Sequence, residues 1–129
     1  MSVKVDLGLL ADTMRDYGLA YLLTVSDDQR AHAVAVQPRL DDRVLYVDGL
    51  GNRTRANVQA RPAVTLLFPP VEQGGYSLIV DGRASLADGT GDTGASVVPT
   101  HAVLHRPADH ATGPTDSSCG NDCVPVAEA

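Results

Sequence analysis

Apolar residues recur with helical spacing close to the N-terminus. They stand at i, i+3, i+4 and i+7, which places them on one face of an α-helix; these residues are Leu7, Leu10, Ala11 and Met14. Asp6 precedes the run and its side chain can accept a hydrogen bond from the first turn, so we predict that it caps the helix. Gly18 is predicted to end it.

After this helix, short apolar runs separated by turn residues predict six β-strands. The predicted strands span residues 19–25, 31–37, 43–48, 63–68, 76–86 and 97–104. Strict alternation in the second run places alanines on one face and His32, Val34 and Val36 on the other. Gly82 inside the fifth run indicates a β-bulge or a close approach of backbones. Residues 88–95 are rich in glycine and are predicted to form a loop.

One short basic segment, residues 52–60, lies between the third and fourth strands and is predicted to be a crossover helix. The fold class is therefore mostly β: a six-stranded, mostly antiparallel barrel with an N-terminal helix and a short crossover helix. We assign residues 1–106 to this domain. Residues 107–129 are rich in Gly, Pro and Ser without a period, and are expected to be a tail that is disordered or ordered only by a ligand or partner.

The crossover helix is the main candidate for a binding site. Its first turn contains Arg53 and Arg55, beside backbone amides that have no partner within the helix. These amides and the helix dipole favour an anion, and arginine can bind phosphate through two parallel hydrogen bonds. The alternative is that the two arginines lie on a solvated helix face, as most charged clusters do. Because the chain as a whole has a net charge of −6, we favour a phosphate site.

Composition limits the classes of partner. The excess of acidic residues argues against nucleic acid as a partner, and no apolar run reaches the roughly 18 residues of a membrane span. The N-terminus lacks the basic and apolar pattern of a signal peptide, so we expect a cytoplasmic protein. With 129 residues and 4% aromatic content, the core must consist of Val, Leu and Ala, which favours a β-rich interior and a buried dimer interface.

Several segments, in this order and spacing, resemble the split β-barrel family of pyridoxamine 5'-phosphate oxidase-like proteins, in particular its actinobacterial flavin- and deazaflavin-dependent oxidoreductases. The matching segments are Ala31-His32-Ala33-Val34, Leu45-Tyr46-Val47, Arg55-Ala56-Asn57-Val58, Pro62 with the strand after it, and Asp81-Gly82-Arg83-Ala84. The resemblance covers roughly residues 6 to 88 and implies a homodimer that binds FMN or coenzyme F-420 at the subunit interface.

The resemblance also implies roles for individual residues. Asn52, Arg53, Thr54, Arg55 and Asn57 would bind the cofactor, chiefly its phosphate, and His32 and Val34 (or the opposing alanine face) would lie beside its ring. Thr54 stands where the family often has lysine, and the C-terminus of the true pyridoxamine phosphate oxidases is missing. We therefore expect an FMN- or F-420-dependent oxidoreductase that acts on a small organic molecule, rather than that specific oxidase.

Histidines and cysteines toward the C-terminus allow other readings. His101, His105 and His110 precede Cys119 and Cys123, and imidazole with thiolate suits zinc. Three other interpretations are also possible: a disulfide between the two cysteines, haem bound by a tail histidine, or a mobile tail without a specific role. His32 is either a core or interface histidine, or a group that bonds the cofactor edge or donates a proton. The alternative function is a non-catalytic protein that binds a cofactor, haem or zinc.

Overall fold

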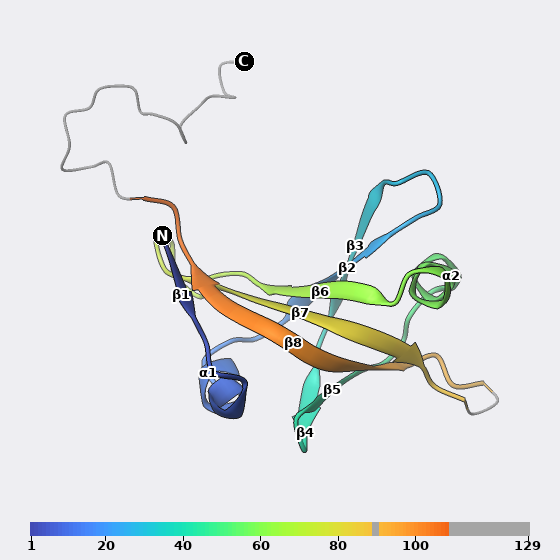
Figure 1. Cartoon of the computed structure of the whole chain (residues 1–129), viewed down its shortest axis with the longest axis horizontal. Helices are drawn as coiled ribbons and strands as arrows, with labels where there is room; N and C mark the ends of the chain where they lie inside the picture. The colour runs from blue at the N-terminus through green and yellow to red at the C-terminus, as the bar shows by residue number, and fades with distance from the viewer. Residues whose placement is uncertain (89–90, 109–129) are drawn as a thin grey trace, which may run out of the picture.

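A single antiparallel sheet organises the computed structural model, which describes residues 1–88 and 91–108. The strands are β1 (Ser2–Lys4), β2 (Ala20–Val25), β3 (Ala31–Val36), β4 (Arg39–Asp41), β5 (Val44–Val47), β6 (Ala63–Phe68), β7 (Ser77–Leu86) and β8 (Ala95–His105). Their order is β3-β2-β6-β7-β8-β5-β4, and β1 pairs with β8. Figure 1 shows β6, β7 and β8 as long curved strands, so that the sheet forms a half-barrel. The predicted fold, an antiparallel split barrel with two helical segments, is confirmed.

The N-terminal helical segment is shorter than the sequence predicts. It begins as a 3-10 turn, η1 (Leu7–Leu9), and continues as α1 (Leu10–Met14). Asp6 caps it as predicted, because its carboxylate accepts a 2.9 Å hydrogen bond from the backbone N–H of Gly8. The helix ends at Met14, and the prediction that Gly18 ends it is wrong. The crossover helix α2 (Asn52–Ala60) has the predicted bounds and joins β5 to β6.

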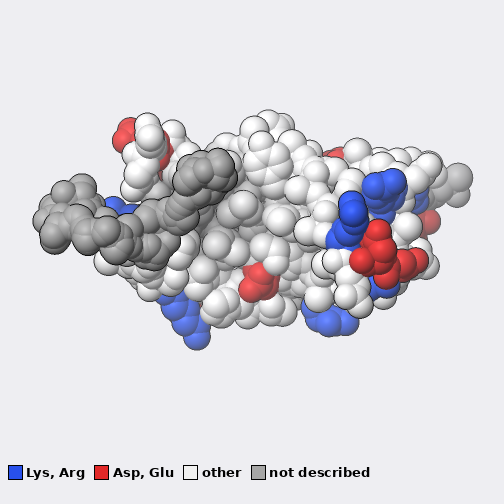
Figure 2. Space-filling model, turned by 90° about the horizontal axis from the view of Figure 1, so that it is seen from above, with Lys and Arg blue, Asp and Glu red and all other residues white. Residues whose placement is uncertain are grey.

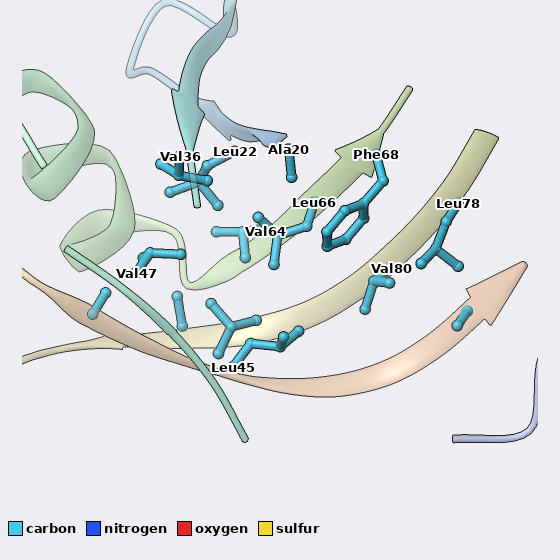
Figure 3. Close-up of a cluster of buried hydrophobic side chains, with 14 of the residues drawn as sticks. Ala20, Leu22, Val36, Leu45, Val47, Val64, Leu66, Phe68, Leu78 and Val80 are labelled. Atoms are coloured by element: carbon cyan, nitrogen blue, oxygen red, sulfur yellow. The ribbon is translucent and has the colours of Figure 1, made fainter. Parts of the chain in front are cut away.

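The core is made almost entirely of aliphatic side chains, as the composition predicts. Inward-facing residues of the strands meet inside the half-barrel around Phe68, which is 1% exposed (Figure 3). Burial alternates along β7, where the buried residues are Leu78, Val80, Gly82 and Ala84. At Gly82 the pairing of β7 with β8 shifts register, so the predicted bulge is confirmed. A Cβ atom here would lie 2.7 Å from the carbonyl oxygen of Val98, which explains the glycine.

The prediction of six strands misses two. All six predicted strands are present, but the described part of the chain contains eight. The two additional strands, β1 and β4, are three residues long and contain no buried residue. Their short Ser-Val-Lys and Arg-Leu-Asp sequences carry no apolar pattern that periodicity could detect. Across the described ranges, no helix is both long and apolar enough to span a membrane.

Candidate functional site

The turn between β2 and β3 and the N-terminal half of α2 enclose an open pocket of about 500 Å³. Eight residues line it: Ser26, Asp27, Asp28, Arg30, Ala31, His32, Arg53 and Asn57. Figure 2 shows basic and acidic side chains gathered at the end of the molecule where α2 and this turn lie in Figure 1. The fold thus brings the predicted residues His32, Arg53 and Asn57 to one pocket, although they come from distant parts of the sequence.

The N-terminus of α2 carries positive charge that no side chain of its own offsets. The N-cap residue is Gly51, which has no side chain to accept from the first turn, and the first turn contains no acidic residue. Arg53 stands there instead, where a positive charge opposes the helix dipole. The exposed Asn52 begins the helix. An anion beside these amides would satisfy the donors and remove the repulsion.

The acidic side chains of the pocket are already paired. Asp27 accepts a 2.7 Å bond from Arg61, and Asp28 lies 3.6 Å from the Nε atom of Arg30. Because the Ser26 hydroxyl donates to Asp28, and the positive charge of Arg53 acts in the same direction, the pKa of Asp28 lies below its usual range. Arg53 itself forms no ion pair with any described residue, so its guanidinium remains open to a ligand.

Arg55 lies in the same turn of α2 as Arg53 but does not line the pocket. Its side chain is half-buried, and its Nε atom is buried without a hydrogen-bond partner among the residues that the structure describes. Leaving a buried charged donor unpaired is costly, and most such groups in proteins have a partner. A phosphate at the start of α2 would provide one once the side chain turns toward it, since guanidinium and phosphate form strong charge-assisted bonds. The residues present therefore fit a phosphate-bearing cofactor.

Two other predicted residues of α2 face the sheet. Thr54 is 1% exposed, and Asn57 is 6% exposed. The amide of Asn57 donates a 3.0 Å hydrogen bond to the hydroxyl of Thr24, which is buried on β2. The face formed by Thr54, Asn57 and Val58 therefore holds the helix on the sheet, and it turns Arg53 toward the pocket.

The predicted ring-contact residues lie on β3. His32 is half-buried and lines the pocket, opposite Thr24 of β2. Val34 is also half-buried, but it packs against the hydrophobic core. The open face of β3 is the other one, formed by the exposed Ala31, Ala33 and Ala35. Of the two faces considered from the sequence, the alanine face is the one that a flat ring can approach.

Among the weak metal candidates, His105 is the one that falls within the described residues. His105 ends β8, and its Nδ1 atom lies 2.9 Å from the hydroxyl of Ser2. In residues 1–88 and 91–108, no three His, Cys, Asp or Glu side chains form a group that could hold a metal ion. His110, Cys119 and Cys123 lie outside the described residues.

Sequence reasoning did not identify the β2–β3 turn as part of the site. Residues 26–29 were predictable as a turn, but nothing in their order shows that the hairpin reaches α2. The contact is made by the ion pair of Arg61 with Asp27 and by the bond from Asn57 to Thr24. Both are long-range contacts, and neither residue pair has a local sequence signal.

Comparisons with known proteins agree with this architecture. Residues 10–113 match a family model described as pyridoxamine 5'-phosphate oxidase. Uncharacterized proteins of Mycobacterium bovis and Mycobacterium tuberculosis are each 44% identical, over 94% of this chain and 94% of their own.

Solved structures share the fold at low identity. An FAD-binding protein from Mesorhizobium loti has a TM-score of 0.64 at 16% identity, covering 81% of this chain and 96% of its own. An FAD-binding protein from Mycobacterium smegmatis has a TM-score of 0.60 at 14% identity, covering 82% and 100%. An F-420 reductase has a TM-score of 0.55 at 19% identity, covering 65% and 87%.

Proposed function

Because the chain belongs to the pyridoxamine 5'-phosphate oxidase family, we propose that it is an oxidoreductase that binds FMN or coenzyme F-420 at the N-terminus of α2. The observation that carries the proposal is the pair of arginines, one with an orphaned buried Nε atom, beside an uncapped helix start. The FAD-binding and F-420-related proteins of the same fold support this choice of cofactor class.

The pocket and the residues around it have distinct roles in this proposal. Arg53 and Arg55, with the amides at Asn52, hold the phosphate through charge-assisted bonds. The small side chains of Ala31, Ala33 and Ala35 leave room for a flat ring against β3. His32, at the edge of the pocket, can donate or accept a hydrogen bond through its ring nitrogens. The bound cofactor would supply hydride transfer, which no side chain provides, while the protein orients its ring and excludes water.

We also propose that the protein is a homodimer. The outward face of three neighbouring strands contains no charged residue, and these strands lie side by side in register: β3 with β2, and β2 with β6. The outward residues are Tyr21, Leu23, Val25, Ala31, Ala33, Ala35, Ala63, Thr65 and Leu67. Tyr21 and Val25 are each 39% exposed. Contiguous apolar surface is typical of a protein interface, and a second copy would shield the ring site on β3 from water.

Titration of FMN and of F-420 into purified protein, followed by fluorescence, tests the proposal. The test variant is Arg53→Ala with Arg55→Ala. The control is Arg15→Ala with Arg39→Ala, which removes the same charge from exposed arginines that pair with Asp12 and Asp48. If each charge-assisted bond contributes about 1.5–3 kcal/mol, the test variant should lose about 100-fold or more in affinity. The control should bind as the wild type does.

Equal affinities for the test variant and the wild type would refute the phosphate site. Steady-state oxidation of the reduced cofactor with a panel of organic acceptors then separates an enzyme from a carrier. Turnover supports the oxidoreductase, whereas stoichiometric binding without turnover supports a non-catalytic cofactor-binding protein.

A further inference from the structure

A second pocket, of about 360 Å³, lies between the N-terminal helical segment, the β4–β5 turn and β8. Its lining consists of Leu7, Gly8, Leu10, Ala11, Leu40, Asp42, Arg43, Val98 and Pro99. None of these residues belongs to the pocket beside α2. In Figure 1, α1 and the β4–β5 hairpin project below the sheet, while α2 lies at its right-hand end.

The interior of this second pocket is apolar. Leucines come from η1, α1 and β4, while Ala11, Val98 and Pro99 complete the wall. Val98 is 53% exposed, so a branched apolar side chain is left facing water at the opening. The volume falls within the range of about 300–1,000 Å³ that is usual for small-molecule sites, which are mostly apolar with a few polar groups. These properties favour a ligand with an aliphatic body.

Arg43 provides the polar end of the pocket. Its guanidinium reaches η1, since a Cβ atom built on Gly8 would lie 3.6 Å from its Nη2 atom. Arg43 forms no ion pair with any residue in the described ranges. Two carboxylates lie nearby, that of Asp6, which accepts the N–H of Gly8, and that of Asp42 in the lining, but neither forms an ion pair with Arg43. An unpaired guanidinium at the rim of an apolar pocket suits an anionic end group.

Both central residues of the β4–β5 turn adopt the left-handed backbone conformation. Asp41 pairs with Val44, so Asp42 and Arg43 form a two-residue hairpin turn, with φ angles of +51° and +69°. Turns of this kind favour Asn-Gly, because a side chain disfavours the left-handed region. Arginine is a poor choice for the second position. Strained residues of this sort cluster at functional sites, where the side chain has a use.

We propose that this pocket binds a small molecule with an aliphatic body and one anionic end, a carboxylate that pairs with Arg43. The body would pack against the leucines, Ala11 and Val98, and the carboxylate would lie at the β4–β5 turn. This site is separate from the cofactor pocket, so the two proposals stand or fall independently.

Octanoate is the probe. Octylamine and octanol are the comparison ligands, because they have the same alkyl chain but not the negative charge. Binding is followed by NMR of the methyl groups of Leu10, Ala11, Leu40 and Val98 in the full chain. Octanoate should shift these signals in a saturable manner. Its affinity should be higher than that of octylamine or octanol. Two variants test the location: Arg43→Gly, which suits the left-handed backbone, and Ala11→Phe, which fills the pocket from an exposed helix position.

Both variants should weaken octanoate binding by about tenfold or more, as expected for a lost charge-assisted bond or a blocked cavity. The controls are Arg15→Ala and Ala56→Phe, exposed positions that do not line the pocket, and both should bind octanoate as the wild type does. Urea unfolding midpoints close to that of the wild type show that the variants are folded. Any of three results would overturn the proposal. Octylamine could bind as tightly as octanoate, the NMR shifts could spread over the whole protein, or neither variant could change octanoate binding.

Discussion

The hydrogen bond from Asn57 to Thr24 is the contact through which the fold positions the phosphate site, and it can be tested directly. The amide of Asn57 and the hydroxyl of Thr24 are both buried, with residue exposures of 6% and 1%. Replacing one of the two side chains leaves the polar group of the other buried without its hydrogen-bond partner. Thr24→Val leaves a buried N–H without an acceptor, and Asn57→Leu leaves a buried hydroxyl without its donor. Each single change should cost about 1–3 kcal/mol.

The double variant Thr24→Val with Asn57→Leu should cost less than the sum of the two single changes. Both polar groups are then absent, and two apolar side chains meet in their place, which can be nearly neutral. We expect a coupling energy of about 1 kcal/mol or more, as is usual for residues in direct contact. Urea unfolding at 25 °C measures it. With a slope of about 1.5 kcal/mol per M, a loss of 1.5 kcal/mol lowers the midpoint by about 1 M.

The control is Thr100→Val, which removes an exposed hydroxyl that donates a 3.2 Å bond to the carbonyl of Asp81. This change should cost no more than about 0.5 kcal/mol, as is usual at the surface. Strictly additive effects of the two buried substitutions would refute the reasoning, because they would show that the two side chains do not depend on each other.

Two further predictions concern stability at high pH and assembly. Burial raises the pKa of Tyr17, and the charge of Asp16 adds to this effect. The contribution of Tyr17 to stability is therefore fully present below about pH 10, the pKa of the unfolded state, and it is lost as the pH rises through the pKa of the folded state. Urea midpoints measured from pH 9 to 11 should therefore fall in the wild type and fall less steeply in Tyr17→Phe, and equal slopes would contradict this. Leu23→Glu, at the centre of the uncharged outward face, should convert the proposed dimer to a monomer in size-exclusion chromatography with light scattering. A change of mass in the control Arg15→Glu, or none in Leu23→Glu, would argue against this interface.

Much of the fold follows from local sequence signals. Alternation predicts the strands because one face of each is buried, and α2 is bounded by Gly51 and by Pro62, which cannot continue a helix. Gly82 predicts the bulge because a Cβ atom has no room there. The strands β1 and β4 could not be predicted, since a three-residue strand with no buried face gives no periodicity and forms only because a longer neighbour offers its edge.

The candidate site, too, could be predicted only in part from the sequence. The arginines of α2 and the histidine of β3 were identifiable from residue type and from the position of a helix start. The roles of Thr54 and Asn57 were not, because a polar residue near a basic cluster can face either the ligand or the sheet. Only the packing of α2 on β2 shows that both are buried on the sheet, with Asn57 also in the wall of the pocket.

By itself, the sequence determined that this protein is an antiparallel barrel with a basic helix start, because alternation, capping and turn chemistry act over a few residues. The tertiary structure decided what those elements enclose. It paired Asp27 with Arg61 and Asp28 with Arg30, which leaves Arg53 without a carboxylate partner in the described ranges, and it placed Arg43 over a pocket formed by three distant segments. Such pairings depend on distances between residues far apart in the chain, and no local pattern encodes them.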